Sequence, residues 1–378
     1  MRNKLRIGIE VQRLFRKKKH GMEVVALEII KQLQQLDTYN EYIIYVREDV
    51  DKCIVETSNF KIRELRAKSY FTWEQISLPA AVRRDKLDFL HSTCNTSALW
   101  LSVPLMLTLH DIIYLEKTDF KGTAYQNFGN IYRRLIVPRI VKMSRIIVTV
   151  SNFEREAILK KLNLADGDVK VIYNAVSPKF TMAFEPEQIA EFRQCYSLPS
   201  SFILFLGNTA PKKNTVNVIK AYVEYRRRSP DGLPLVILDF DKNLVFELLE
   251  EMNAMDLQEA FLFPGYIPSE EMPQLYNSST LFLYPSLRES FGLPILEAMA
   301  CGVPVITSNT SSMPEVAADA ALFVDPFDHL NITDQIDYIL SQPELMTEMK
   351  AKGVKRAAKF TWKSSAEQLL EVYQELIK

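Results

Sequence analysis

LFLYPSLRESFGLPILEAMACGVPVIT, residues 281–307, is the stretch that decides the fold. Its first four residues form an apolar run that is short enough for a strand buried on both faces. A polar loop follows over 285–293, and Pro294 fits the first helical position, where its missing N–H costs no hydrogen bond. Gly302 and Pro304 end that helix, and residues 303–307 predict the next strand. The order strand, loop, helix, strand is typical of a parallel α/β sheet.

The same stretch contains candidate ligand-binding groups. A helix that begins at Pro294 points unpaired N–H groups at the loop before it, which favours a bound anion. Glu289 lies in that loop and Glu297 lies one turn into the helix. Two carboxylates would repel a phosphate, so they need ligand hydroxyls from which to accept hydrogen bonds. A nucleotide sugar meets both demands, whereas an ordinary βαβ unit with one solvated and one capping glutamate explains the spacing equally well.

The motif ESFGLPILE resembles the Glu-x7-Glu signature of family 4 retaining glycosyltransferases, and AMACGVPVI continues that family's pattern. The resemblance implies that Glu297 binds the ribose hydroxyls of a donor. It also implies a loop that holds the donor sugar and phosphate through Glu289, Ser290, Phe291, Gly292 and Leu293.

A basic loop, GNTAPKKN, follows a predicted strand at 202–206 and precedes a helix for which Asn214 is a natural N-cap. At this helix N-terminus Lys212 and Lys213 each destabilise the helix by about 0.3–1 kcal/mol if exposed. A bound anion makes their contribution favourable instead. This is a second indication of a pyrophosphate site. The resemblance implies that Lys213 neutralises the leaving diphosphate. Many family members carry an arginine where Asn208 stands, and Lys212 lacks the bidentate fork of an arginine.

The N-terminal half also offers candidate donor contacts. Gly21 lies between a basic loop, 12–21, and a predicted helix, where it would allow close approach of a phosphate; a simple turn glycine is the alternative. His110 follows the predicted strand 105–109, at the edge where open α/β sheets bind ligands. A hydrogen-bonded structural histidine is the commoner case. The resemblance of TLHD to the family implies that His110 lies against the transferred sugar and that Asp111 is secondary.

Further strands are expected at 5–11, 42–46, 89–91 and 145–150, and helices at 22–36, from Trp73 and around 128–136. Ser151 to Glu154 predicts a capping box. The helix around 128–136 carries Arg133 and Arg134, with Arg139 and Lys142 after it. This indicates a solvated helix face, with a membrane-facing one as the alternative.

Two further short motifs bear on metal binding and on nucleobase binding. Asp239-Phe240-Asp241 matches the metal–diphosphate motif of the other large glycosyltransferase fold, but a lone tripeptide is common by chance, and we expect no metal site. GYIPSEEMPQLY resembles the family segment that pairs with the nucleobase. This implies base contacts at Gly265 and Ile267, with Tyr266 between them.

Size and composition allow two domains in 378 residues. Four scattered cysteines fit a reducing cytoplasm, and no apolar run is long enough for a membrane span or signal peptide. Residues 1–178 hold 29 basic and 20 acidic residues, whereas the remainder holds 17 and 27. Such asymmetry suggests an interaction surface on the first half, for an anionic membrane or a phosphate-bearing acceptor. No nucleic-acid module is recognisable, so nucleic acid is not expected as a partner.

Together these observations predict an α/β protein of the GT-B fold, with two doubly wound, Rossmann-like domains facing across a cleft. We expect an N-terminal acceptor-side domain at 1–178, with helix 360–378 crossing back to it, and a nucleotide-sugar-binding domain at 179–359. The expected reaction is metal-independent, cofactor-free transfer of a hexose, mannose by analogy, from a nucleotide diphosphate sugar to a saccharide or lipid-linked saccharide, with retention. A catalytically silent homologue that binds the donor is the alternative. A nicotinamide dehydrogenase is disfavoured because the chain contains no G-x-G-x-x-G.

Overall fold

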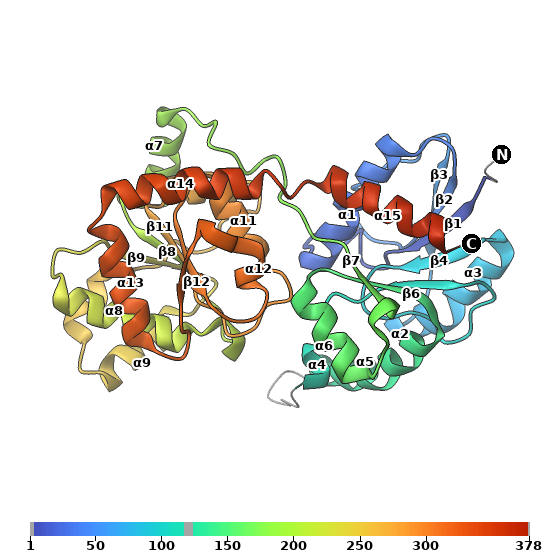
Figure 1. Cartoon of the computed structure of the whole chain (residues 1–378), viewed down its shortest axis with the longest axis horizontal. Helices are drawn as coiled ribbons and strands as arrows, with labels where there is room; N and C mark the ends of the chain where they lie inside the picture. The colour runs from blue at the N-terminus through green and yellow to red at the C-terminus, as the bar shows by residue number, and fades with distance from the viewer. Residues whose placement is uncertain (1–3, 117–123, 377–378) are drawn as a thin grey trace. The chain divides into compact units, whose positions relative to one another are not determined.

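The computed structural model describes residues 4–116 and 124–376, which form two compact units (Figure 1). The N-terminal unit comprises Met1–Asn174 together with Trp362–Lys378, and the C-terminal unit comprises Ala175–Thr361. Each unit has its own parallel sheet with helices on its faces, and each has its own apolar core.

The sheet of the N-terminal unit has seven parallel strands in the order β3-β2-β1-β4-β5-β6-β7. The strands are β1 Arg6–Glu10, β2 Glu41–Arg47, β3 Phe60–Leu65, β4 Phe89–Ser92, β5 Leu105–Thr108, β6 Ser144–Thr149 and β7 Val169–Val171. The five inner strands were predicted because they are continuous apolar runs buried on both faces. The two edge strands were not predicted. In β3, FKIREL mixes apolar and charged residues because much of an edge strand faces solvent.

The helices of this unit are α1 Gly21–Leu36, α2 Tyr70–Thr72, the π-helical turn η1 Trp73–Ser77, α3 Leu78–Asp85, α4 Ile113–Glu116, α5 Ala124–Met143, α6 Asn152–Leu162, the 3-10 turn η2 Asp166–Asp168 and α15 Trp362–Glu375. The helix expected from Trp73 in fact begins earlier, because Ser69 caps α2 by accepting from the Thr72 N–H. Ser151 caps α6 in the same way through the Glu154 N–H, which is the serine half of the predicted capping box. The Glu154 carboxylate also accepts from the Ile112 N–H at 2.9 Å.

The sheet of the C-terminal unit has six parallel strands in the order β10-β9-β8-β11-β12-β13. The strands are β8 Ile203–Leu206, β9 Leu235–Leu238, β10 Phe261–Leu262, β11 Leu281–Tyr284, β12 Val305–Ser308 and β13 Leu322–Val324. The helical segments are α7 Pro186–Cys195, η3 Pro211–Lys213, α8 Thr215–Arg228, α9 Lys242–Glu251, η4 Met255–Ala260, α10 Met272–Ser278, α11 Leu293–Ala300, α12 Met313–Ala317, η5 Ala318–Ala320, α13 His329–Leu340 and α14 Pro343–Ala357. The strand at 281–284 is confirmed residue for residue, and the next strand begins two residues later than the predicted Val303.

Strand order fixes where each sheet can bind a ligand. In the C-terminal unit the chain runs outward from β8 to β10 and then returns to the other side of β8 with β11. The switch point therefore lies between β8 and β11, and open α/β sheets bind ligands outside the carboxyl ends of the strands at such a point. The loops that leave these two strands are 207–214 and 285–292, the two motif-bearing loops. In the N-terminal unit the corresponding switch lies between β1 and β4.

Helix α15 returns to the N-terminal unit and packs beside α1 (Figure 1). Its Tyr373 is buried, and the hydroxyl lies 2.7 Å from Nδ1 of His91, whose Nε2 lies 2.7 Å from the Thr108 hydroxyl. Burial lowers the pKa of His91 to about 3, so the ring is neutral at physiological pH. This polar chain ties the C-terminal helix to β4 and β5.

We predict that Tyr373→Phe lowers the free energy of unfolding of the N-terminal unit by about 1–3 kcal/mol, because a buried imidazole nitrogen loses its partner. The three tryptophans, Trp73, Trp100 and Trp362, all belong to this unit, so urea denaturation followed by tryptophan fluorescence reports on it alone. Glu371→Gln, at an exposed position of the same helix, is the control. Equal midpoints for the two variants would contradict this role of Tyr373.

Candidate active site

The loop between β11 and α11 owes its shape to Gly292. This residue adopts φ +99°, and a Cβ here would also lie 3.2 Å from Cδ1 of Ile295. Because L side chains rarely adopt such a backbone conformation, glycine is required where the loop turns into the helix. The helix begins at Leu293, so Pro294 takes the second helical position and not the first. It still fits there because the first turn has no intrahelical N–H partners.

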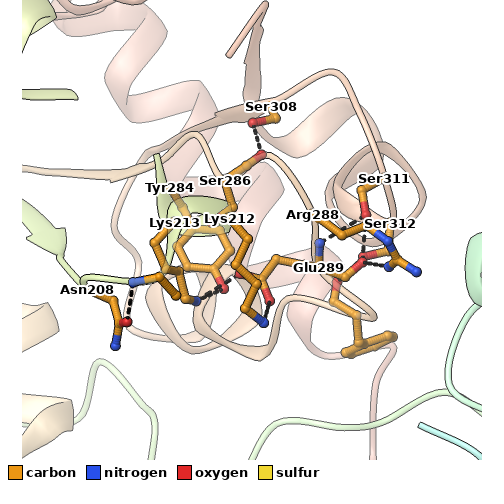
Figure 2. Close-up of polar contacts among 12 residues, drawn as sticks. Asn208, Lys212, Lys213, Tyr284, Ser286, Arg288, Glu289, Ser308, Ser311 and Ser312 are labelled. Carbon is orange, nitrogen blue, oxygen red and sulfur yellow. Dashed lines mark hydrogen bonds and ion pairs between the residues drawn. The ribbon is translucent and has the colours of Figure 1, made fainter. Parts of the chain in front are cut away.

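Serines at the start of α12 fix the backbone of Glu289. The Glu289 N–H donates to Oγ of Ser311 at 3.0 Å, and the Ser311 hydroxyl donates back to the Glu289 carbonyl at 2.6 Å. The Ser312 hydroxyl donates to the carbonyls of Glu289 and Phe291, each at 2.9 Å. These contacts are drawn in Figure 2 for the labelled residues. The position of the Glu289 side chain is therefore set by a fixed backbone.

The basic loop packs directly on the Glu289 loop. The Leu287 N–H donates to the Lys212 carbonyl at 2.7 Å. Asn214 occupies the predicted N-cap position of α8, but its side chain does not make the capping hydrogen bond. Its backbone is left-handed, at φ +62°, and its amide instead donates to the carbonyls of Pro285 and Pro326 at 3.0 and 2.7 Å. Asn214 thus joins the two loops.

Lys213 and Glu289 form the centre of the candidate site (Figure 2). Nζ of Lys213 lies 2.8 Å from Oε1 of Glu289, donates to the Tyr284 hydroxyl at 2.9 Å, and lies 4.8 Å from the centre of the Tyr284 ring. Nζ of Lys212 lies 3.8 Å from Oε2 of the same carboxylate. Oε1 of Glu289 is buried and, apart from this ion pair, has no hydrogen-bond partner among the described residues.

The charges in this cluster decide the ionisation of Glu289. Burial raises the pKa of Glu289, but the neighbouring Lys213 and Lys212 charges outweigh that effect and hold the pKa below its usual value. Glu289 is therefore an anion at neutral pH. The cluster carries two cations and one anion, and the excess positive charge lies at the N-termini of α8 and α11, which suits an incoming phosphate.

Glu297 lies on α11, and the Tyr276 hydroxyl donates to its Oε2 at 3.1 Å. Burial raises the pKa of Glu297 to about 7, and the hydrogen bond from Tyr276 and the charge of Lys179 only partly offset that rise. The two carboxyls of the motif thus differ in ionisation. Glu289 stays charged, whereas Glu297 titrates near neutrality.

The base-side candidates lie after β10. Gly265 has φ +82°, and Ile267 is buried, whereas the Tyr266 side chain between them is 70% exposed. A glycine is required by this backbone conformation rather than by close packing, because a Cβ at Gly265 would meet nothing within 4 Å.

The candidates from the N-terminal unit have different surroundings. Nε2 of His110 lies 2.8 Å from the Thr93 carbonyl oxygen, so this nitrogen carries the proton, and the His110 N–H donates to Oδ1 of Asn95 at 2.6 Å. Burial lowers the pKa of His110, which favours the neutral ring, with Nε2–H donating to Thr93 and Nδ1 left as an acceptor. Gly21 is the first residue of α1, and a Cβ there would meet nothing within 4 Å. Packing within the chain does not require that glycine.

The Asp-x-Asp tripeptide has structural uses. Asp241 caps α9 by accepting from the Asn243 N–H, and Asp239 occupies a left-handed turn at φ +58°. Within residues 4–116 and 124–376 no group of three or more histidine, cysteine, aspartate or glutamate side chains is arranged to hold a metal ion.

Sequence reasoning missed several residues of this region. Tyr284 was treated only as the end of a strand, and Tyr276 only as part of a resembling segment. Ser311 and Ser312 lie over twenty residues beyond Glu289 and carry no motif of their own. The hollow of about 400 Å³ beside the basic loop, lined by Glu247 and Glu251 of α9, lies next to the lysines rather than over them. We place the candidate site on the cluster of Lys212, Lys213 and Glu289, because its charges suit the nucleotide sugar that the sequence predicts.

Comparison with known proteins gives two family models that together span most of the chain. The model described as "Glycosyltransferase Family 4" matches residues 19–180, and that described as "Glycosyl transferases group 1" matches residues 191–375. An O-antigen chain mannosyltransferase B of Escherichia coli is 32% identical over 62% of this chain and 61% of its own length. A serotype-specific mannosyltransferase WbdA of the same species is 30% identical over 71% of this chain and 33% of its own. The matched region thus spans about a third to three-fifths of these relatives.

Solved structures share the fold. A glycosyltransferase from Rickettsia africae superposes with a TM-score of 0.74 at 19% identity and covers 100% of both chains. Anabaena Alr3699/HepE, solved with UDP-glucose, superposes with a TM-score of 0.74 at 18% identity over 98% of this chain and 100% of its own. With the two parallel sheets, these likenesses confirm the GT-B fold. Among the described residues, every helix is too short or too polar to span a bilayer.

We predict that Gly292→Ala destabilises the C-terminal unit by about 1–2 kcal/mol, since the left-handed backbone strains any residue with a Cβ. Thermal unfolding followed by far-UV circular dichroism measures the loss, while the tryptophan transition of the N-terminal unit should stay in place. Gly167→Ala, where the added methyl meets nothing within 4 Å, is the control. A Gly292 variant as stable as this control would refute the requirement for a left-handed residue.

Proposed function

The chain belongs to the family 4, group 1 glycosyltransferases, and we propose that it transfers a hexose from a nucleotide diphosphate sugar to a hydroxyl of a saccharide or lipid-linked saccharide. The observation that carries the proposal is the cluster of Lys213, Lys212 and Glu289 at the switch point of the C-terminal sheet. Mannose is the proposed sugar, because the relatives reported above are named mannosyltransferases. The UDP-glucose complex of HepE supports a nucleotide-sugar donor.

In this proposal Lys213 is the main electrophilic group. As the bond between the sugar C1 and the diphosphate breaks, negative charge grows on the leaving oxygen, and the preorganised Nζ stabilises it without a metal. Lys212 and the helix N-termini contribute to the same field. The acceptor oxygen bonds to C1 as the bond from C1 to the diphosphate breaks, and its proton passes to the departing phosphate oxygen, with retention of configuration. The transition state has oxocarbenium character, so a nearby carboxylate stabilises the positive charge that develops on the sugar.

Glu289 changes partner when the donor binds. Without donor it neutralises Lys213, and with donor the diphosphate takes over that charge while the carboxylate accepts from sugar hydroxyls. The amides from Ser290 to Leu293 bind the sugar and phosphate, and Glu297 accepts from the ribose. Gly265 and Ile267 contact the base. By resemblance, His110 contacts the sugar. Because its Nε2–H already donates to the Thr93 carbonyl, the unprotonated Nδ1 is the nitrogen that would accept from a sugar hydroxyl. Gly21, also by resemblance, adjoins the donor phosphate.

We expect Lys213→Ala to lower kcat by at least a hundredfold, because one preorganised charge on a leaving group is worth about 3 kcal/mol or more. Transfer from GDP-mannose and UDP-glucose is measured by release of the nucleotide diphosphate, with EDTA present. The control is Lys220→Ala, an exposed lysine on α8. Undiminished turnover by a folded Lys213 variant would refute the assignment, and donor binding without any turnover by the wild type would favour the silent homologue.

We expect the affinity for a nucleotide sugar to fall about fivefold from pH 8 to pH 6, if binding lowers the pKa of Glu297 by about one unit. The sign follows because the ionised form accepts ribose hydroxyls, whereas the raised pKa, about 7, leaves the acid protonated below neutrality. Isothermal titration with the intact nucleotide sugar is the measurement, since its phosphodiesters do not titrate in this range. Glu297→Gln should bind weakly and without this pH dependence. An unchanged slope in that variant would exclude Glu297 as its source.

A further inference from the structure

Helix α5 presents an unusual outer face. Among the α5 side chains that the structure describes, Met143 is exposed at the edge of this face, and five other exposed side chains recur every three or four residues within an arc of about 80°. They are Phe128, Ile131, Leu135, Arg139 and Lys142. The first three are 62%, 44% and 55% exposed. The stripe is therefore apolar in its first half and basic in its second.

These apolar residues are not needed for the core of the N-terminal unit. The opposite face of α5 already packs into that core through Ile136, Val137, Ile140 and Val141, all buried. A surface helix of a globular protein normally keeps its outer face polar. The three exposed apolar side chains thus require another explanation.

Neighbouring segments extend the apolar surface. Gln75 joins them, because its amide donates to the Tyr132 hydroxyl of α5 at 2.8 Å and to the Ser97 carbonyl at 3.0 Å, and accepts from the Leu99 N–H at 3.0 Å. Next to these contacts, Ile76 is 62% exposed and Trp100 is 80% exposed. Phe71, which is 47% exposed, packs edge-on against the Tyr132 ring at 6.0 Å. Large exposed apolar side chains therefore lie on three segments that contact one another through Gln75, Phe71 and Tyr132.

The charges on these segments have one sign. Within residues 66–86 the acidic residues, Glu74 and Asp85, are buried, and the exposed charged residues are all basic. Residues 94–104 contain no charged residue, and residues 124–145 contain only basic ones, of which Arg139, Lys142 and Arg145 are exposed. An apolar surface whose own segments expose only positive charge fits a partner with an apolar interior and an anionic surface.

We propose that this apolar–basic face, Phe71, Ile76, Trp100, Phe128, Ile131, Leu135, Arg139 and Lys142, docks the protein on an anionic lipid bilayer. Aromatic and aliphatic side chains enter the headgroup boundary, and the arginine and lysine pair with lipid phosphates. Nucleic acid would satisfy the charges but not the aliphatic residues. The helix lies on the bilayer and does not span it, which agrees with the hydropathy of the described helices. The proposal concerns a surface distant in sequence from the donor motifs and does not depend on the reaction.

The test is co-sedimentation of the full chain with vesicles, without nucleotide or acceptor. Wild-type protein should bind vesicles of phosphatidylcholine with about 30% phosphatidylglycerol, and bind pure phosphatidylcholine at least tenfold more weakly. The triple variant Phe128→Ser, Ile131→Ser, Leu135→Ser and the double variant Arg139→Glu, Lys142→Glu should each lose at least tenfold in partitioning. High salt should weaken the wild type, because its surface charges are screened.

Matched controls distinguish binding through this face from nonspecific binding through other exposed apolar or basic side chains. Val50→Ser with Val55→Ser removes two other exposed apolar side chains of the same unit, and Lys160→Glu with Lys161→Glu reverses two exposed lysines on α6. Both should bind as the wild type does, and circular dichroism checks that every variant is folded. Absence of vesicle binding, equal losses in the controls, or wild-type self-association that the triple variant abolishes would each overturn the proposal.

Discussion

The ion pair between Lys213 and Glu289 is the interaction around which the C-terminal unit is arranged. A buried carboxylate is tolerated only when it is paired, and this one keeps its charge because two ammonium groups lie within 4 Å. Both partners come from loops, at residues 213 and 289, which must be held in register. The backbone contact from Leu287 to Lys212, the bridging amide of Asn214 and the serines of α12 supply that register.

This arrangement keeps the donor site ready before the donor arrives. The cost of gathering like charges and desolvating a carboxylate is met during folding, by packing and hydrogen bonds outside the reacting centre. A diphosphate then meets fixed cations instead of mobile ones. In our proposal Lys213 and Glu289 exchange one partner for another, so neither charge is ever left buried and unpaired.

Much of this could be predicted from the sequence, because parallel strands are apolar runs and the motif loops are local in sequence. The strand at 281–284 and the paired loops follow from such patterns. The edge strand β3 does not, since it mixes apolar and charged residues and much of it faces solvent. The side-chain contacts of Asn214 were not predicted because its left-handed backbone and its tie to Pro326 depend on a segment more than a hundred residues away. Ser311, Ser312 and Tyr276 were missed for the same reason.

The most direct measurement is a crystal structure of the protein with a nucleotide diphosphate. The account predicts that an oxygen of the terminal phosphate lies within about 3 Å of Nζ of Lys213, that Glu289 has turned away from that lysine, and that the ribose hydroxyls reach Glu297. A diphosphate bound away from Lys213, or held by a metal ion on Asp239 and Asp241, would contradict it.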